Sequence, residues 1–83
     1  MTENKYINTI SLDNLTIGEI GIIKEIKCCN YLKRRLYDLG LIKGAKIKKA
    51  FISPGGDPIA YKLRNTFIAL RKEDCRNINI NIN

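Results

Sequence analysis

Histidine is absent from the 83 residues, which removes the side chain that most often acts as a general base or metal ligand. The eight acidic residues are scattered along the chain, and the two serines have no base motif near them. Gly55-Gly56 lacks the GxxxxGK(S/T) pattern of a phosphate-binding loop. We therefore expect no enzyme and no catalytic residue.

Cysteines are few and odd in number: Cys28, Cys29 and Cys75. An odd count argues against a disulfide framework, and none of them has the C-x-x-C spacing of a zinc site. Small buried hydrophobes or surface thiols in a reducing compartment are the simplest interpretation. We expect no bound metal and no cofactor, and a metal-sensing module stays open as a third alternative.

Long apolar runs are missing as well. No stretch approaches the roughly 20 residues that a membrane-spanning helix needs. The start of the chain is polar and lacks the apolar core of a signal peptide. We expect a soluble, cytoplasmic protein that can work beside a membrane without spanning it.

Acidic residues are nearly absent from one segment. Between Lys27 and Lys49 lie eight basic residues against Asp38 alone, so this segment carries the whole net charge of +7. A concentrated positive field implies an acidic partner, which can be nucleic acid, anionic lipid headgroups or an acidic protein surface. The alternative is a solubilising face without a partner.

Isoleucine dominates the aliphatic residues, and β-branched side chains favour strands. Five short strands in one small domain favour a closed barrel, because closure removes the sheet edges. In the first strand Ile20 and Ile22 share one face, but Ile23 and Ile26 do not continue this alternation. A bulge near Lys24 would explain the change. The expected strands cover residues 19–28, 44–52, 59–64, 67–71 and 77–83.

The rest of the chain is assigned around these strands. Residues 1–10 are expected to form a flexible N-terminal segment, and residues 11–83 the barrel domain. Ser11 would cap one helical turn, and residues 72–76 would form another. Asn65-Thr66 would connect a hairpin, and the last strand would fray because asparagine is a poor strand former. The inward-facing residues expected from the alternation are Ile59, Tyr61, Leu63, Ile68 and Leu70, with Phe51 also in the core.

One short helix is predicted over residues 30–39. Asn30 is a favourable N-cap, and Gly40 suits the left-handed position after the helix. Leu41 would complete a Schellman-type stop by contacting Leu36. A helix this short is not stable alone, so its apolar stripe must pack on the sheet. That stripe consists of Leu32, Leu36 and Leu39.

The segment LKRRLYDLGLIKG, residues 32–44, resembles the signature of the ferrous iron transport protein A (FeoA) family. Three further segments agree in the same order: SLDNLTIGEIGII before it, and the GDPI turn and the ALRKED run after it. The resemblance implies a small SH3-like barrel of about five strands with one short α-helix, without catalytic activity. It also implies a cytoplasmic role with the membrane GTPase-transporter FeoB. DtxR-type repressors carry the same fold, but this chain has no helix-turn-helix.

The resemblance and the charge distribution together predict the residues that bind the partner. Lys33, Arg34 and Arg35 would contact acidic protein surface or anionic headgroups, and Asp57 and Arg71 would add contacts. The expected partner is FeoB, nucleic acid is not expected, and weak homo-oligomerisation stays open.

The leading alternative is a small basic SH3-like barrel that binds nucleic acid. Such barrels combine a basic surface with exposed aromatic side chains. The basic segment of this chain contains Tyr31, Tyr37 and Phe51.

Overall fold

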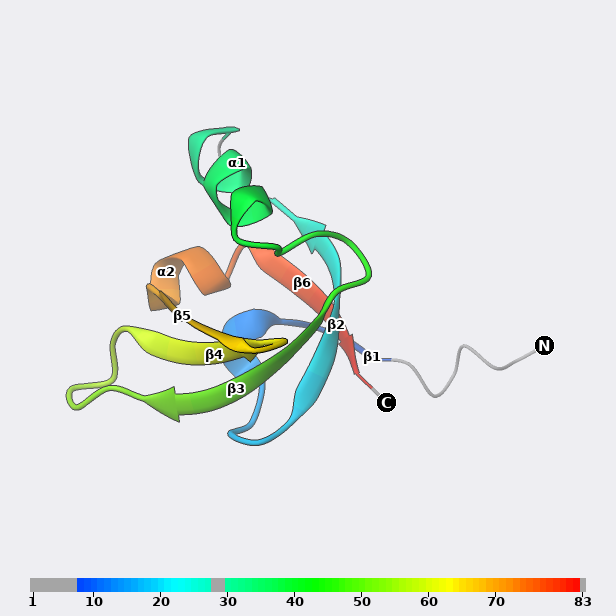
Figure 1. The fold of residues 1–83 in the computed structure, drawn as a ribbon. Helices are drawn as coiled ribbons and strands as arrows, with labels where there is room; N and C mark the ends of the chain where they lie inside the picture. The colour runs from blue at the N-terminus through cyan, green and yellow to red at the C-terminus, as the bar shows by residue number, and fades with distance from the viewer. Residues whose placement is uncertain (1–7, 28–29, 83) are drawn as a thin grey trace.

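The fold is mainly β, with one short helix above a strongly curved sheet (Figure 1). The computed structural model describes residues 8–27 and 30–82. All five expected strands, the expected helix and both helical turns are confirmed. The elements in chain order are β1 (Asn8–Ser11), the 3-10 turn η2 (Leu12–Asn14), β2 (Ile20–Ile26), α1 (Asn30–Asp38), β3 (Lys46–Ile52), β4 (Ile59–Leu63), β5 (Thr66–Leu70), α2 (Lys72–Cys75) and β6 (Ile78–Ile82).

A single antiparallel sheet joins the strands in the order β1-β6-β2-β3-β4-β5. Within the described residues the ladder ends at β1 and β5, so hydrogen bonds do not complete the closed barrel that we expected. η2 packs against α2 and β6. The Tyr61 hydroxyl of β4 donates to the Leu12 carbonyl of η2 at 3.2 Å. Through this bond η2 connects β4, near one edge of the sheet, to β6, near the other edge.

The strand β1 was not predicted. It pairs with β6 along its whole length, from Asn8 opposite Ile82 to Ser11 opposite Asn79. Residues 8–10, which were expected in a flexible N-terminal segment, are therefore part of the sheet, and residues 1–7 lie outside the described residues. The last strand, β6, pairs on both sides, with β1 and β2, and its fraying stays a prediction.

Two register shifts bend the sheet. The first lies in β2 between Ile23 and Glu25 and confirms the predicted bulge near Lys24. The second lies in β3 between Lys49 and Phe51 and breaks the inward–outward alternation there. Phe51 consequently faces solvent with 55% of its surface exposed, so its predicted place in the core is wrong.

The core follows the predicted alternation in β4 and β5. Ile59, Tyr61 and Leu63 are buried, as are Ile68 and Leu70. β6 contributes Ile80, which is fully buried. A Cβ on Gly21 would lie 2.6 Å from the Ile80 Cδ1, so glycine at this position leaves room for the buried Ile80 side chain.

The interior also holds polar groups on the sheet face that contacts η2. Lys49 is only 6% exposed, and its Nζ donates to the Asp13 carbonyl at 3.1 Å. Burial raises the pKa of Tyr61 well above its usual range. Burial also raises the pKa of Cys75 to about 11, although the neighbouring Tyr61 hydroxyl opposes that rise. Cys75 therefore behaves as a small buried hydrophobe, as predicted; Cys28 and Cys29 lie outside the described residues.

Three local predictions differ from the structure by a residue or a partner. Leu63 pairs with Thr66, so the hairpin turn is Arg64-Asn65, with Arg64 at a φ of 59°. The Ser11 hydroxyl donates to the Asp13 carboxylate at 2.6 Å and makes no side-chain bond to a backbone N–H of η2. α1 begins at Asn30, which is therefore the first helical residue rather than the cap.

Candidate functional site

The end of α1 is fixed by a Schellman motif, as predicted. Gly40 has a φ of 98°, its N–H donates to the Tyr37 carbonyl at 2.9 Å, and the Leu41 N–H donates to the Leu36 carbonyl at 2.9 Å. Leu36 and Leu41 are buried on the sheet. Leu39 was predicted in the same buried stripe, but it is 42% exposed. The tight turn at Gly40 thus leaves an apolar side chain at the surface.

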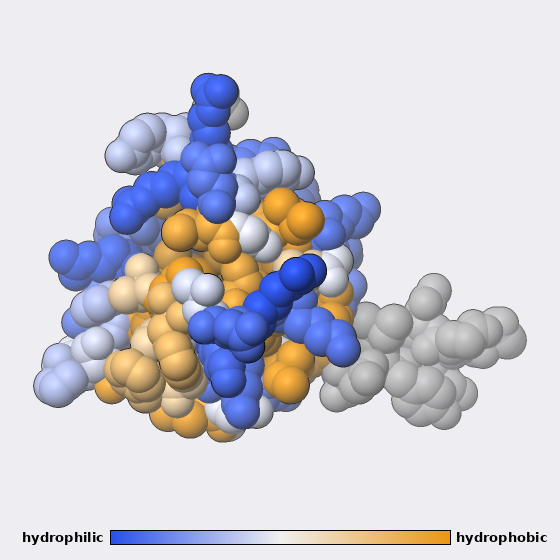
Figure 2. Space-filling model, in the orientation of Figure 1, coloured by the Kyte–Doolittle hydropathy of each residue, from blue (hydrophilic) through white to orange (hydrophobic). Residues whose placement is uncertain are grey.

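Leu39 borders a groove between α1 and the β5–α2 end of the sheet, which we call the α1 groove. Its volume is about 220 Å³. Figure 2 shows hydrophobic surface directly below α1, with hydrophilic side chains along its margins. The groove is lined by the apolar Leu32, Leu36, Leu39, Pro58, Ala69 and Leu70 and by the charged Arg35, Arg71 and Asp74.

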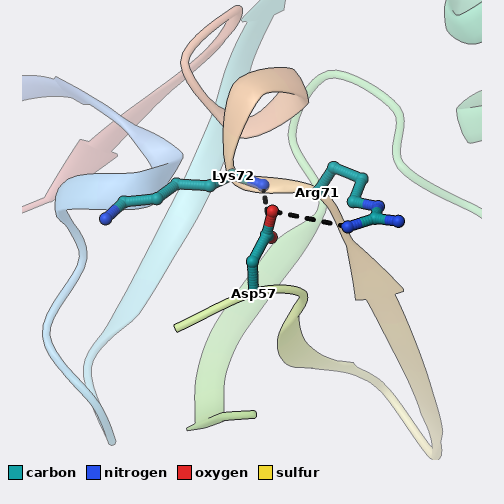
Figure 3. Close-up of polar contacts among 3 residues, drawn as sticks. All are labelled: Asp57, Arg71 and Lys72. Atoms are coloured by element: carbon teal, nitrogen blue, oxygen red, sulfur yellow. Dashed lines mark hydrogen bonds and ion pairs between the residues drawn. The ribbon is translucent and has the colours of Figure 1, made fainter. Parts of the chain in front are cut away.

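The structure brings two of the predicted residues, Asp57 and Arg71, together (Figure 3). The Asp57 Oδ1 accepts a hydrogen bond from the Lys72 backbone N–H at 2.9 Å, at the start of α2. Its other oxygen lies 3.6 Å from the Arg71 Nη1. Because both side chains are partly exposed, this ion pair is worth less than about 1 kcal/mol. Asp57 thus has internal partners that hold the loop before β4 against α2.

The three predicted helix cations are exposed but point to different surroundings. Arg35 lines the α1 groove together with Arg71. Lys33 borders a separate hollow of about 410 Å³ on the β2 side of α1, together with Lys24 and Lys43. Arg34 and Arg35 both border a third hollow, beside Tyr31 and Asp38. The hollows therefore place Arg34 beside Arg35 and Arg35 beside Arg71, whereas Lys33 lines a separate hollow; of the predicted residues, the α1 groove itself is lined by Arg35 and Arg71.

Sequence reasoning missed the apolar lining of this site. Ala69 and Leu70 come from β5, and Pro58 comes from the loop that precedes β4. Only the folded chain places these residues beside α1. The sequence carried no signal for these contacts, because Pro58, Ala69 and Leu70 are distant from α1 along the chain.

The described residues contain no group of three or more Cys, Asp or Glu side chains placed to hold a metal ion. Likewise, none of the helices in residues 8–27 and 30–82 has the length and apolar character to cross a membrane. The arrangement provides an apolar groove with cations beside it, on top of an apolar core.

A curved antiparallel sheet of short strands with one surface helix is the architecture of an SH3-like barrel. The family is identified from the sequence, over nearly all of the described residues. The model of the FeoA domain family matches residues 10–82, and the chain belongs to this family. The family resemblance and the fold class predicted from the sequence are both confirmed.

Two solved structures share the fold. The solution structure of the FeoA protein from Chlorobium tepidum has a TM-score of 0.84 and 30% sequence identity, over 88% of this chain and 70% of that one. The crystal structure of Stenotrophomonas maltophilia FeoA complexed with zinc has a TM-score of 0.76 and 24% identity, over 86% of this chain and 88% of that one. The second protein is described as a prokaryotic SH3 domain protein, which agrees with the barrel found here.

A relative from Porphyromonas gingivalis joins a similar domain to a larger protein. It is a fusion of Fe(2+) transport protein A with the Fe(2+) transporter FeoB, and it is 24% identical over 71 residues. The match covers 86% of this chain but spans only 8% of the length of the fusion protein. The family is thus one connected with Fe(2+) transport.

Proposed function

We propose that this protein is a non-enzymatic accessory of Fe(2+) uptake that docks, on the cytoplasmic side, on a FeoB-type transporter through the α1 groove. The observation that carries the proposal is the exposed apolar lining of the groove, with Leu39 at 42% exposure, between Arg35 and Arg71. The fusion relative supports the choice of partner, because covalent linkage gives two modules a high effective concentration without any new contact.

The size of the groove favours a protein partner over a small-molecule ligand. Ligand pockets typically have roughly 300–1,000 Å³ and enclose most of their ligand, whereas this groove has about 220 Å³. Apolar side chains of a docked segment would fill it. Carboxylates beside them on the same segment would meet the two arginines, and arginine suits this contact because its planar guanidinium binds carboxylates with two parallel hydrogen bonds.

The test uses two pairs of variants with matched controls elsewhere on the chain. Leu39→Asn removes an apolar contact inside the groove, whereas Ile42→Asn changes an aliphatic residue that is 44% exposed outside it. Arg35→Glu reverses a groove charge, whereas Lys33→Glu reverses a charge on another side of α1. The two variants of each pair make the same change in polarity or in charge, and they differ in where that change lies.

Binding is measured by capture of detergent-solubilised FeoB on the immobilised protein. We expect Leu39→Asn and Arg35→Glu each to weaken binding by about tenfold or more, a loss typical of central interface residues. The controls should stay within about threefold of the wild type, as contacts outside the centre do. Thermal melting of each variant verifies the fold. If both groove variants bound FeoB as tightly as the wild type, the α1 groove would not be the docking site.

A further inference from the structure

The outer face of the sheet presents a row of exposed side chains that no contact described above uses. Ile20 of β2 stands opposite Lys48 of β3, Lys48 opposite Lys62 of β4, and Lys62 opposite Phe67 of β5. Directly paired residues on one face have adjacent side chains. All four are exposed, while the residues that follow them on these strands are buried: Gly21, Lys49, Leu63 and Ile68.

Two more cations enlarge this row into a patch. Lys46 and Arg64 line the same shallow hollow, of about 170 Å³, as Ile20, Lys48 and Lys62. No acidic residue lines this hollow in the described chain. The carboxylate of Glu19, next to Ile20 in sequence, accepts a hydrogen bond from the Thr16 N–H at 3.0 Å and is thus committed to the preceding turn. We call this patch the cationic sheet face: Ile20, Lys46, Lys48, Lys62, Arg64 and Phe67.

The arrangement is unfavourable for the isolated protein. Like charges placed directly opposite on a sheet destabilise it, and Lys48 faces Lys62 in this way. The described side chains offer one weak relief, since the Lys62 Nζ lies 5.8 Å from the centre of the Phe67 ring. Where a local rule is broken without internal compensation, a functional surface is the expected reason. An anionic ligand would turn the repulsion into attraction.

The apolar members of the face indicate which anion. Ile20 is 54% exposed and Phe67 is 60% exposed. Lysines beside exposed apolar side chains suit an anionic bilayer, where the cations meet headgroups and the apolar groups enter the interface. Single-stranded nucleic acid is held by aromatic side chains stacked on bases, and this face offers one aromatic ring. We infer that the cationic sheet face binds the surface of an anionic phospholipid bilayer.

The cationic sheet face and the α1 groove share no lining residue. A protein that rests on the membrane through the sheet would keep its groove available for the transporter. The inference does not rest on the proposed function, because lipid binding is a property of this chain alone. The capture of FeoB from detergent contains no bilayer, so each proposal can fail without the other.

The experiment is co-sedimentation of the full chain with vesicles of phosphatidylcholine alone or mixed in equal parts with phosphatidylglycerol. Lys48→Gln/Lys62→Gln neutralises the centre of the face. Lys33→Gln/Arg34→Gln removes the same charge from α1 and controls for net charge. A lysine near an anionic surface contributes about fivefold in affinity, so the sheet variant should bind anionic vesicles about 25-fold more weakly. The helix variant should lose less than about fivefold. Phe67→Ala should weaken binding without changing its dependence on salt.

Three outcomes would overturn the inference. The wild type could fail to bind anionic vesicles in preference to neutral ones. The two double variants could lose affinity equally, which would show that net charge alone acts. Finally, the sheet variant could lose binding to single-stranded DNA in a fluorescence anisotropy assay while its vesicle binding is unchanged, which would assign the face to nucleic acid.

Discussion

Two adjacent rungs of the β3–β4 ladder use lysine in opposite ways. In one rung Lys49 pairs with Tyr61, and both side chains point inward and donate to carbonyls of η2. In the next rung Lys48 pairs with Lys62, and both side chains point outward into a patch of like charge. The side of the pleat, rather than the residue type, therefore decides whether a lysine supports the fold or stays available to a ligand.

The largest effect on the free energy of unfolding is expected in the inward-facing pair of Lys49 and Tyr61. Lys49→Ala removes a buried side chain together with the donor to the Asp13 carbonyl. We expect the free energy of unfolding to fall by about 3 kcal/mol, as for other long buried side chains. Lys48→Ala, one residue away and exposed, should change it by less than about 0.5 kcal/mol. Urea unfolding of the two variants measures the difference, and equal losses would refute the assignment of opposite roles.

The pH dependence of the free energy of unfolding tests the buried face of the sheet without any substitution of a lysine. Burial raises the pKa of Cys75 to about 11 from its ordinary value near 9, and it raises the pKa of Tyr61 in the same direction. Both groups are neutral when folded, and the unfolded chain releases their protons first. The free energy of unfolding therefore keeps its full value below about pH 9. It falls as the pH rises from there towards the pKa values of the folded protein.

The expected loss from Cys75 alone is about 1.4 kcal/mol at pH 10. Urea unfolding at pH 8 and pH 10 measures it. Cys75→Ala removes one of the two groups, so its free energy of unfolding should fall less steeply over the same interval. Parallel decreases in the variant and the wild type would assign the alkaline loss to other groups.

The sequence predicted the features that depend on neighbours along the chain. The bulge near Lys24 was visible because the isoleucines of that strand follow two phases that no regular strand can join. The stop of α1 was visible because Gly40 and Leu41 occupy the positions that a Schellman motif requires. The second bulge was invisible because residues 50–52 are all apolar, so a change of phase leaves no mark in their pattern.

Features that depend on the assembled fold could not be predicted in this way. β1 has a short, mostly polar sequence and becomes a strand because β6 offers it a partner. The α1 groove needs Leu39 and Leu70 side by side, although they are distant in sequence. The family resemblance suggested Asp57 and Arg71 as contacts for a partner, but only the structure shows that they pair with each other.

The smallest expected effect concerns the outer rung and has the opposite sign. Lys48→Thr removes the repulsion with Lys62, keeps Lys62 beside Phe67 and places a good strand former in β3. We expect a gain in the free energy of unfolding of about 0.5 kcal/mol at low ionic strength. The part of this gain that comes from charge should fade as salt is added, because exposed charges are screened over about 10 Å at 0.1 M.

Lys46→Thr is the matched control for this gain. Lys46 lies on the same face of the same strand and pairs with Ile22 of β2 as Lys48 pairs with Ile20, but no lysine of β4 is paired with it. It should therefore show no comparable salt-dependent gain, and an equal gain would assign the effect to net charge. A gain confined to Lys48 would mean that the natural sequence keeps a destabilising residue at the centre of the cationic sheet face. Folding alone does not explain such a residue, whereas binding to an anionic surface does.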